Sequence, residues 1–475
     1  MSIAKNTTIL TFASVIQKIL AFVYFTLVAR GIGVENIGKY SFAISFAMIF
    51  SIFVDLGLTS AMVREIARAR DKIKVYVGTV FSVKILFGVI TLGLIYAVIN
   101  IMNYPEITRQ FVYLAGLAIV LDSFHLTFYG VFRGLRVLKY EAVGLIIGQL
   151  FILAFGLSVI YLNAPLYFLF IALILGSLFN IIFSFSLVRI KQGFFPWPAF
   201  DKKIFLFLGK IASAFALAGI FVKIYSYIDT VLLSYLKGDL AVGWYSIPIK
   251  LTLAFQFIPM ALVASLYPTL SYYFKESRAR LRVTFEKGMR YLILVAVPLA
   301  FGIGILADKI ILSLYGADFS PSIIPLQILA VGLVFAFLSF PVGSLLNACN
   351  KQKVQTIILG LTMVVNIVLN LILIPRYGVI GASITALVSY FFLFSIGIMR
   401  ARKIVDYKIG FLFNIFVKSL LASIVMIGII SFLKPFVNFV ILSLLGMVIY
   451  GIVMWIIRGI DKEDITYFRR MFARK

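Results

Sequence analysis

Apolar residues gather along the chain in runs of about 20, separated by short segments that hold most of the charged residues. A run of that length crosses the ~30 Å hydrocarbon core of a bilayer as an α-helix. The pattern recurs over the whole chain and predicts an all-α polytopic membrane protein with about fourteen transmembrane helices. We expect them at residues 9–29, 41–62, 77–99, 111–132, 142–162, 166–188, 211–233, 244–267, 291–312, 325–347, 354–374, 378–399, 411–433 and 436–457.

The basic residues alternate between loops in step with these runs. One set of loops, which includes both termini, holds 32 of the 44 lysines and arginines, the opposite loops hold seven, and five lie within spans. The positive-inside rule therefore places both termini in the cytoplasm, at the plasma or inner membrane. The net charge of +26 is explained by this alternation, so we exclude nucleic acid as a partner.

The composition supports a membrane protein and excludes several kinds of structural and functional site. Hydrophobic residues make up 63% of the chain, more than a soluble domain needs. The only cysteine, Cys349, excludes a disulfide framework, and the only histidine, His125, excludes a histidine-built metal site. Because no nucleophile elbow or phosphate loop is present, we expect no enzyme activity and no cofactor. The first span is too long for a signal-peptide core, and we expect it to be retained.

The spans fall into two groups of six and a final pair. A shift of 205 positions places residues 38–41 (GKYS) on residues 243–246 (GWYS), and Lys18 on Lys223. Because six helices return the chain to the same side, the halves form a parallel repeat. We predict an N-lobe over residues 1–188, a cytoplasmic amphipathic linker over 189–203, a C-lobe over 204–400, and a C-terminal helix pair with a basic cytoplasmic tail over 401–475.

Lysines inside the spans are the first candidate binding residues. A lysine at mid-membrane costs about 2.5–3.5 kcal/mol on insertion scales, and Lys18 and Lys223 lie too far from the span ends for their side chains to reach the headgroups. Both therefore face a bundle interior or a watery cavity, which favours an anionic cargo. Lys84, Lys250 and Lys418 begin one or two turns inside their spans, so we expect these side chains to reach the interface. Lys250 stays a candidate because it lies on the eighth span.

Acidic residues inside the spans are the second group of candidates. Asp55 and Asp229 either balance the charge of the lysines or carry a coupling cation, and the residues alone do not decide between these roles. Asp122 and His125 are three residues apart on one helix face, where we expect a shared hydrogen-bond network. His125 is also a candidate proton carrier. A structural pair and a proton relay remain as alternatives for Asp122 and His125.

Several short phrases occur together in this chain. They are residues 38–41 (GKYS), 55–58 (DLGL), 63–68 (VREIAR), 314–319 (LYGADF), 325–329 (PLQIL) and 370–382 (NLILIPRYGVIGA). Together they resemble the multidrug/oligosaccharidyl-lipid/polysaccharide (MOP) exporter superfamily, and within it the polysaccharide, O-antigen-type flippase branch. The resemblance implies two six-helix lobes in a V, a C-terminal two-helix hairpin, and a central cavity lined by helices one, two, seven and eight. Our candidates Lys18, Asp55, Lys223, Asp229 and Lys250 fall on those helices.

The resemblance implies a function as well. We predict a flippase or exporter that moves a polyprenyl-(di)phosphate-linked oligosaccharide across the cytoplasmic membrane by alternating access, for cell-surface polysaccharide or glycan biosynthesis. The alternative is a cation-coupled multidrug or metabolite antiporter on the same fold. A membrane-embedded glycan enzyme is disfavoured because the external loops are short. The expected partners are the lipid-linked substrate, membrane lipids, a coupling ion (H⁺ or Na⁺) or the membrane potential, and glycan polymerase or ligase machinery.

Overall fold

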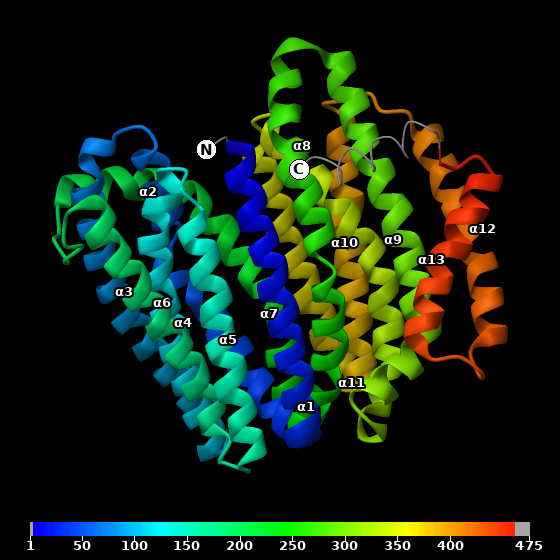
Figure 1. The fold of residues 1–475 in the computed structure, drawn as a ribbon, viewed down its shortest axis with the longest axis horizontal. Helices are drawn as coiled ribbons and strands as arrows, with labels where there is room; N and C mark the ends of the chain where they lie inside the picture. Colours follow the sequence, from blue (N-terminus) through cyan, green and yellow to red (C-terminus); the bar gives the residue numbers. More distant parts are fainter. Residues whose placement is uncertain (1–2, 461–475) are drawn as a thin grey trace. The chain divides into compact units, whose positions relative to one another are not determined.

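The computed structural model describes residues 3–460, and every regular element within this range is helical (Figure 1). Eleven helices in this part of the chain are long and apolar enough to cross a membrane, which confirms an all-α polytopic membrane protein. The elements are α1 (Ile3–Asp55), α2 (Leu58–Ile66), η1 (Arg70–Lys72), α3 (Ile73–Ile101), α4 (Glu106–Gly134), α5 (Lys139–Tyr161), α6 (Tyr167–Gln192), α7 (Lys202–Ala254), α8 (Phe257–Glu276), α9 (Arg278–Leu314), η2 (Ala317–Ser322), α10 (Ile323–Ala348), α11 (Gln352–Arg402), α12 (Ile409–Leu433) and α13 (Phe439–Ile456).

Three of these helices each contain two of the predicted spans. α1 and α7 have 53 residues and α11 has 51. A straight helix of 53 residues is about 80 Å long, more than twice the thickness of the hydrocarbon core. Each of the three is interrupted at one glycine with positive φ, namely Gly33, Gly238 and Gly378. Counted by their halves, they bring the membrane segments of the described chain to the predicted fourteen.

Side-chain contacts show that the chain reverses at these glycines. Tyr40 and Tyr24 are 16 residues apart, yet their hydroxyl oxygens are 3.5 Å apart. A straight helix would separate such residues by about 24 Å. Tyr245 donates a hydrogen bond to Asp229 across Gly238, and Asn366 donates to Ser389 across Gly378 at 3.2 Å. Each interrupted helix is therefore a helical hairpin whose turn needs the left-handed freedom of glycine.

The helices group into two compact units, Met1–Ser246 with Ile367–Val379, and Ile247–Asn366 with Ile380–Lys475. In the first unit α4 packs against α1, α2, α3 and α6 (Figure 1). Its core includes Phe128 and Phe132 of α4, neither more than 1% exposed. The predicted division into lobes at residues 188 and 204 stays a prediction.

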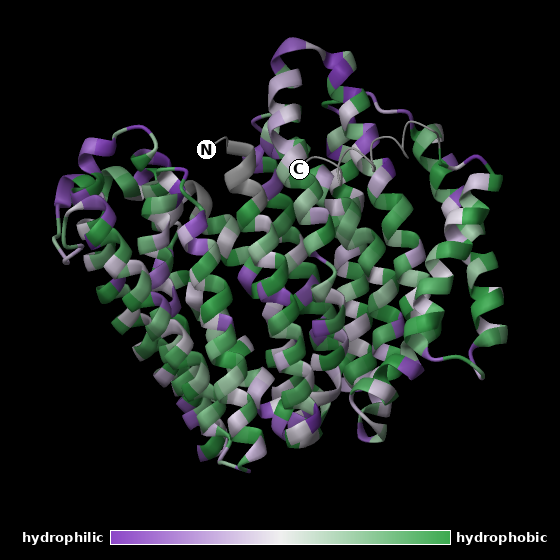
Figure 2. Ribbon diagram, viewed as in Figure 1, coloured by the Kyte–Doolittle hydropathy of each residue, from purple (hydrophilic) through white to green (hydrophobic). Residues whose placement is uncertain are grey.

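In the second unit α9 occupies the central position. It packs against α8, α10, α12 and α13, and α12 packs against α13. α12 and α13 carry large hydrophobic side chains that are more than half exposed, including Phe413, Ile424, Leu444 and Met447. Along the chain, hydrophobic residues dominate the helix lengths, and hydrophilic residues gather mostly near helix ends (Figure 2). Exposed apolar surface of this kind is what a helix in contact with lipid presents.

The second predicted span and the predicted linker each differ from one continuous element. The second predicted span, 41–62, breaks after Asp55, because Leu56 (φ 43°) and Gly57 (φ 82°) are left-handed and α2 begins at Leu58. The predicted linker begins within α6 and continues as an irregular segment before α7. Its backbone contacts α3, since the Ala199 N–H donates to the Gly78 carbonyl at 3.2 Å.

Candidate functional site

A buried ion pair joins α1 to α3 in the first unit. The Lys84 ammonium lies 2.6 Å from a carboxylate oxygen of Asp55. It also donates to the Thr59 hydroxyl at 2.7 Å and to the Ser123 carbonyl at 2.9 Å. The Lys84 residue is 0% exposed, so the expectation that its side chain reaches the interface is wrong. Asp55 and two hydrogen-bond acceptors, the Thr59 hydroxyl and the Ser123 carbonyl, replace the headgroups that a snorkelling lysine would contact.

The break after Asp55 positions its carboxylate. Because Leu56 and Gly57 are left-handed, α2 starts with unpaired backbone N–H groups that point back toward Asp55. The carboxylate accepts from the Gly57 N–H at 3.1 Å and from the Thr59 N–H at 3.2 Å, and it also accepts from the Thr59 hydroxyl. The Asp55 carboxylate thus accepts from backbone N–H groups at the start of α2 and is also the counter-ion of Lys84. Among the described residues, the cation beside the Asp55 carboxylate is Lys84, and a role of Asp55 in carrying a coupling cation stays a prediction.

Asp122 and His125 lie one helical turn apart on α4, as predicted. The His125 Nδ1 is 3.6 Å from the Asp122 carboxylate, which is longer than a hydrogen bond. Asp122 accepts instead from the Ser177 hydroxyl of α6 at 2.5 Å. Half of the Asp122 side chain is exposed, whereas His125 is buried against Tyr129. The direct hydrogen bond between the two residues is therefore absent, and Asp122 is the more accessible of them.

Asp229 lies on the first half of α7 and is buried. Its carboxylate accepts from the Tyr245 hydroxyl and from the Thr230 N–H, the latter at 2.9 Å. Tyr245 lies on the second half of α7, so this contact holds the two halves of the hairpin together. Among the described residues, no lysine or arginine nitrogen lies within 4.0 Å of the Asp229 carboxylate.

Lys223 lies two turns before Asp229 on α7, and its environment is neutral. Its ammonium is 3.7 Å from the sulfur of Met48 on α1 and 5.7 Å from the ring centre of Tyr227. Within residues 3–460, no carboxylate oxygen lies within 4.0 Å of this nitrogen. A thioether and an aromatic face stabilise an ammonium weakly compared with a carboxylate. In this part of the chain, the Lys223 ammonium therefore has no carboxylate beside it that would balance its charge.

The other two candidate lysines differ in their positions. Lys18 lies on the first half of α1 and is partly exposed, beside Gln17, which donates to Gln149 of α5 at 3.4 Å. Lys250 is exposed and belongs to the second unit. Lys418 donates to the Arg458 carbonyl beyond the end of α13, as a side chain directed toward a helix end would.

Four polar partners of the candidate residues were not anticipated: Lys84, Thr59, Ser177 and Tyr245. For Tyr245 a signal was present, because the 205-position shift places Tyr40 on it. The place of Asp55 shortly before a glycine was a second signal, since Asp is among the residues whose side chain accepts hydrogen bonds from the first N–H groups of a helix. Lys84 pairs with Asp55 because α1 and α3 pack against each other. The spacing of residues along one helix gives no information about that packing.

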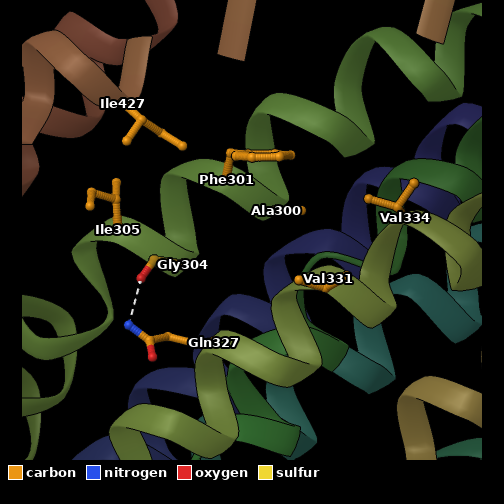
Figure 3. A pocket seen from close by; sticks show the side chains of 8 residues that line it. All are labelled: Ala300, Phe301, Gly304, Ile305, Gln327, Val331, Val334 and Ile427. Carbon is orange, nitrogen blue, oxygen red and sulfur yellow. Dashed lines mark hydrogen bonds between the residues drawn. The ribbon is translucent and has the colours of Figure 1, made fainter. Parts of the chain in front are cut away.

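An apolar cavity of about 290 Å³ lies in the second unit, between α9, α10 and α12 (Figure 3). Phe301, Ile305, Val331 and Ile427 are among the side chains that line it. Its one side-chain amide, of Gln327, donates to the Gly304 carbonyl at 3.2 Å. With no charged lining residue, this cavity suits hydrocarbon and is unsuited to a phosphate.

Comparison with known proteins supports a family assignment. A family model described as polysaccharide biosynthesis protein matches residues 3–274, more than half of the chain, and the MatE model matches residues 214–372. An uncharacterized membrane protein of Methanocaldococcus jannaschii is 24% identical over 96% of this chain and 95% of its own. A putative O-antigen transporter of Shigella flexneri is 27% identical over 81% of this chain and 94% of its own. A probable low-salt glycan biosynthesis flippase of Haloferax volcanii, Agl15, is 24% identical over 82% and 81%.

Solved structures share the fold. The lipid II flippase MurJ in an inward closed conformation superposes with a TM-score of 0.76 at 18% identity, covering 98% of this chain and 99% of MurJ. An inward-facing multidrug resistance MATE transporter gives 0.69 at 15% identity, covering 82% and 95%. The predicted resemblance is thereby confirmed in both sequence and fold. The chain belongs to the polysaccharide biosynthesis protein family.

Proposed function

We propose that this protein is a flippase that moves a polyprenyl-(di)phosphate-linked oligosaccharide from the cytoplasmic to the outer leaflet by alternating access. The match to the polysaccharide biosynthesis family over more than half of the chain carries this assignment. Relatives named as an O-antigen transporter and as a glycan biosynthesis flippase support it. The MatE model covers a smaller share of the chain, so the drug-antiporter alternative is less well supported.

The charges inside the first unit support an anionic headgroup as cargo. Asp55 is paired with Lys84, so these two charges compensate each other. Lys223 has a thioether and a ring beside its ammonium. A diphosphate would supply the missing negative charge and accept hydrogen bonds from the ammonium. We propose that Lys223 and Lys18 bind the phosphates, with Lys250 assisting, while the glycan occupies an aqueous cavity and the polyprenyl chain stays in lipid.

For coupling we propose Asp122 as the residue that exchanges a proton. Its side chain is half exposed, its observed partner is the neutral Ser177 hydroxyl, and His125 lies 3.6 Å away. Asp55 and Asp229 are less suited to this role, because their carboxylates are held by Lys84 and by Tyr245. A proton or Na⁺ gradient, or the membrane potential, would drive the cycle.

The cellular setting is also part of the proposal. The chain is a multi-pass membrane protein, and we place it in the cytoplasmic membrane with both termini in the cytoplasm, because the basic loops lie on that side. Glycan polymerases or ligases would use the delivered substrate outside. We assign translocation to this chain and glycan chemistry to such partners.

Reconstituted vesicles test the function directly. The purified chain is placed in proteoliposomes with a fluorescent polyprenyl-diphosphate oligosaccharide, and outer-leaflet substrate is measured with and without a pH, Na⁺ or voltage gradient. We expect substrate movement, with Asp122→Asn losing the response to a pH gradient. Absence of movement under every gradient, together with extrusion of a cationic dye, would favour the antiporter instead.

Variants at Lys223 and Lys18 test the phosphate site. Each is changed to Gln and, separately, to Arg, and compared at equal protein levels with Lys418→Gln as the matched control. Gln removes the charge and should slow transport by tenfold or more, since a hydrogen bond to a charged group contributes about 1.5–3 kcal/mol. Arg keeps the charge and should retain most activity. Normal transport by both Gln variants would eliminate the phosphate-binding role.

A further inference from the structure

The turns of the first two helical hairpins are related by the internal repeat. Gly33 has φ 79° and ψ 174°, and Gly238, 205 positions later, has φ 79° and ψ −176°. The same shift relates the GKYS phrase to the GWYS phrase, each of which begins at a glycine, Gly38 or Gly243. Both pairs of glycines lie within the first compact unit. The repeat therefore preserves the turn as well as the glycine that follows it.

The two later glycines mark a close approach of backbone to backbone. A Cβ on Gly38 would lie within 3.0 Å of the carbonyl group of Asp239 and at 3.0 Å from the Gly243 nitrogen. A Cβ on Gly243 would lie 2.9 Å from the carbonyl carbon of Val34 and even closer to its oxygen. Val34 and Asp239 are themselves 205 positions apart. The contact is therefore reciprocal, as in an isologous interface.

Buried residues surround this contact. Ile37 and Val242, another pair related by the shift, are both 0% exposed. Tyr104, between α3 and α4, connects the two hairpins: it stacks on Phe42 of α1 with ring centres 4.6 Å apart, and its hydroxyl donates to Ser234 of α7 at 3.1 Å. The contact is closely packed, and glycines at both crossing points let the two backbones meet without side chains between them.

We propose that residues 34–41 and 239–246 form a seam that closes the outer end of the transport pathway, and that glycine at positions 38 and 243 is required for it to close. The role of this seam in the transport cycle rests on the proposed transport function. Its position at the outer end rests on the proposed topology. The charged side chains of the two segments, Glu35, Lys39 and Asp239, are not buried, and Lys39 pairs with Glu35 of its own segment at 2.7 Å, so the segments can separate without leaving a buried charge unpaired. A Cβ at either glycine meets main-chain atoms, which cannot rotate aside, so the seam must part.

A cysteine introduced at the seam reports whether the seam is closed, and this measurement needs no transport assay. In a Cys349→Ser background, Ser41→Cys places a thiol at a residue that is 7% exposed and whose hydroxyl has no hydrogen-bond partner among the described residues. A membrane-impermeant maleimide is added from outside. We expect Gly38→Ala and Gly243→Ala to raise the labelling rate by about 5- to 150-fold, the range given by typical overpacking energies. Gly93→Ala is the matched control, because nothing lies within 4 Å of a Cβ there.

The labelling results test the seam independently of the transport function. Unchanged labelling in folded Gly38→Ala and Gly243→Ala variants overturns the seam even if the protein transports its substrate. Labelling that rises only with reagent on the cytoplasmic side overturns its outer placement. If the alanine variants do not fold, a Tyr104→Cys/Ser234→Cys pair is joined by a short reducible crosslinker. We expect the crosslink to stop transport and reduction to restore it, whereas full transport by the crosslinked protein overturns the proposal.

Discussion

The ion pair between Lys84 and Asp55 allows a sharp test, because its two members are buried to different degrees. The Lys84 side chain is 1% exposed and the Asp55 side chain is 28% exposed. Asp55→Asn removes the negative charge and leaves a carbonyl oxygen that can still cap α2. Lys84→Met removes the positive charge and keeps a long unbranched side chain. Each change therefore isolates the charge from the packing.

The two single variants should differ in cost. Asp55→Asn leaves the Lys84 ammonium wholly buried with only the Thr59 hydroxyl and the Ser123 carbonyl as acceptors, and breaking a buried pair in this way costs about 3–5 kcal/mol. Lys84→Met leaves a partly exposed carboxylate that still accepts from two backbone N–H groups and the Thr59 hydroxyl. We expect a smaller cost, about 1–3 kcal/mol.

Thermal unfolding in detergent, with the double variant included, measures both costs and their coupling. The double variant removes both charges and should be less destabilised than Asp55→Asn alone, so the coupling energy should exceed 1 kcal/mol. Lys418→Met is the control, because Lys418 makes its contact at a helix end. The reasoning is refuted if Lys84→Met is the more damaging single change, or if the double variant loses the sum of the two.

Three further predictions each concern a single residue. Glu141→Gln should lower the free energy of unfolding by about 3 kcal/mol, because Glu141 is 2% exposed and accepts two hydrogen bonds from Arg133; thermal unfolding measures it. Gly238→Ala should cost about 1–3 kcal/mol, because φ 79° with ψ −176° is a backbone region that is essentially restricted to glycine, whereas Gly428→Ala, which meets open space, should cost nothing in the same measurement. Burial raises the pKa of Cys349, just beyond the α10 span, from 9.0 to about 11. Maleimide labelling of native protein should therefore be slow at pH 8 and rise about tenfold per pH unit, and it should be fast once the chain is denatured; rapid native labelling at pH 8 would contradict this.

The membrane segments could be predicted from the sequence because their signal is local. Each span is a run of apolar residues long enough to cross a bilayer, and the three hairpins α1, α7 and α11 keep two such runs on either side of one glycine. The repeat was visible for the same reason, since it preserves short phrases at a fixed offset. What the apolar pattern missed is the break after Asp55, because only two left-handed residues interrupt the run there.

The partners of polar residues inside the spans could not be predicted in the same way. A helix that is apolar on all sides gives no periodic signal for the face on which a charged residue lies. Lys84 and Asp55 are far apart in sequence and meet only because α3 packs against α1. Lys84 was therefore interpreted from its distance to the helix end, whereas Asp122 and His125, one turn apart on α4, were correctly placed as neighbours.

The repeat preserves backbone roles more strictly than side-chain chemistry. Tyr40 and Tyr245 occupy matching positions, and each reaches across its hairpin to the residue 16 positions earlier. In the first hairpin that residue is Tyr24, and in the second it is Asp229. Both contacts bridge the two helices of a hairpin, so bridging is the shared role, and a carboxylate is not needed for it. At this pair of matching positions only the second half has an acid, Asp229. By contrast, both halves have glycine at the turn, Gly33 and Gly238, because the reversal of the chain depends on it.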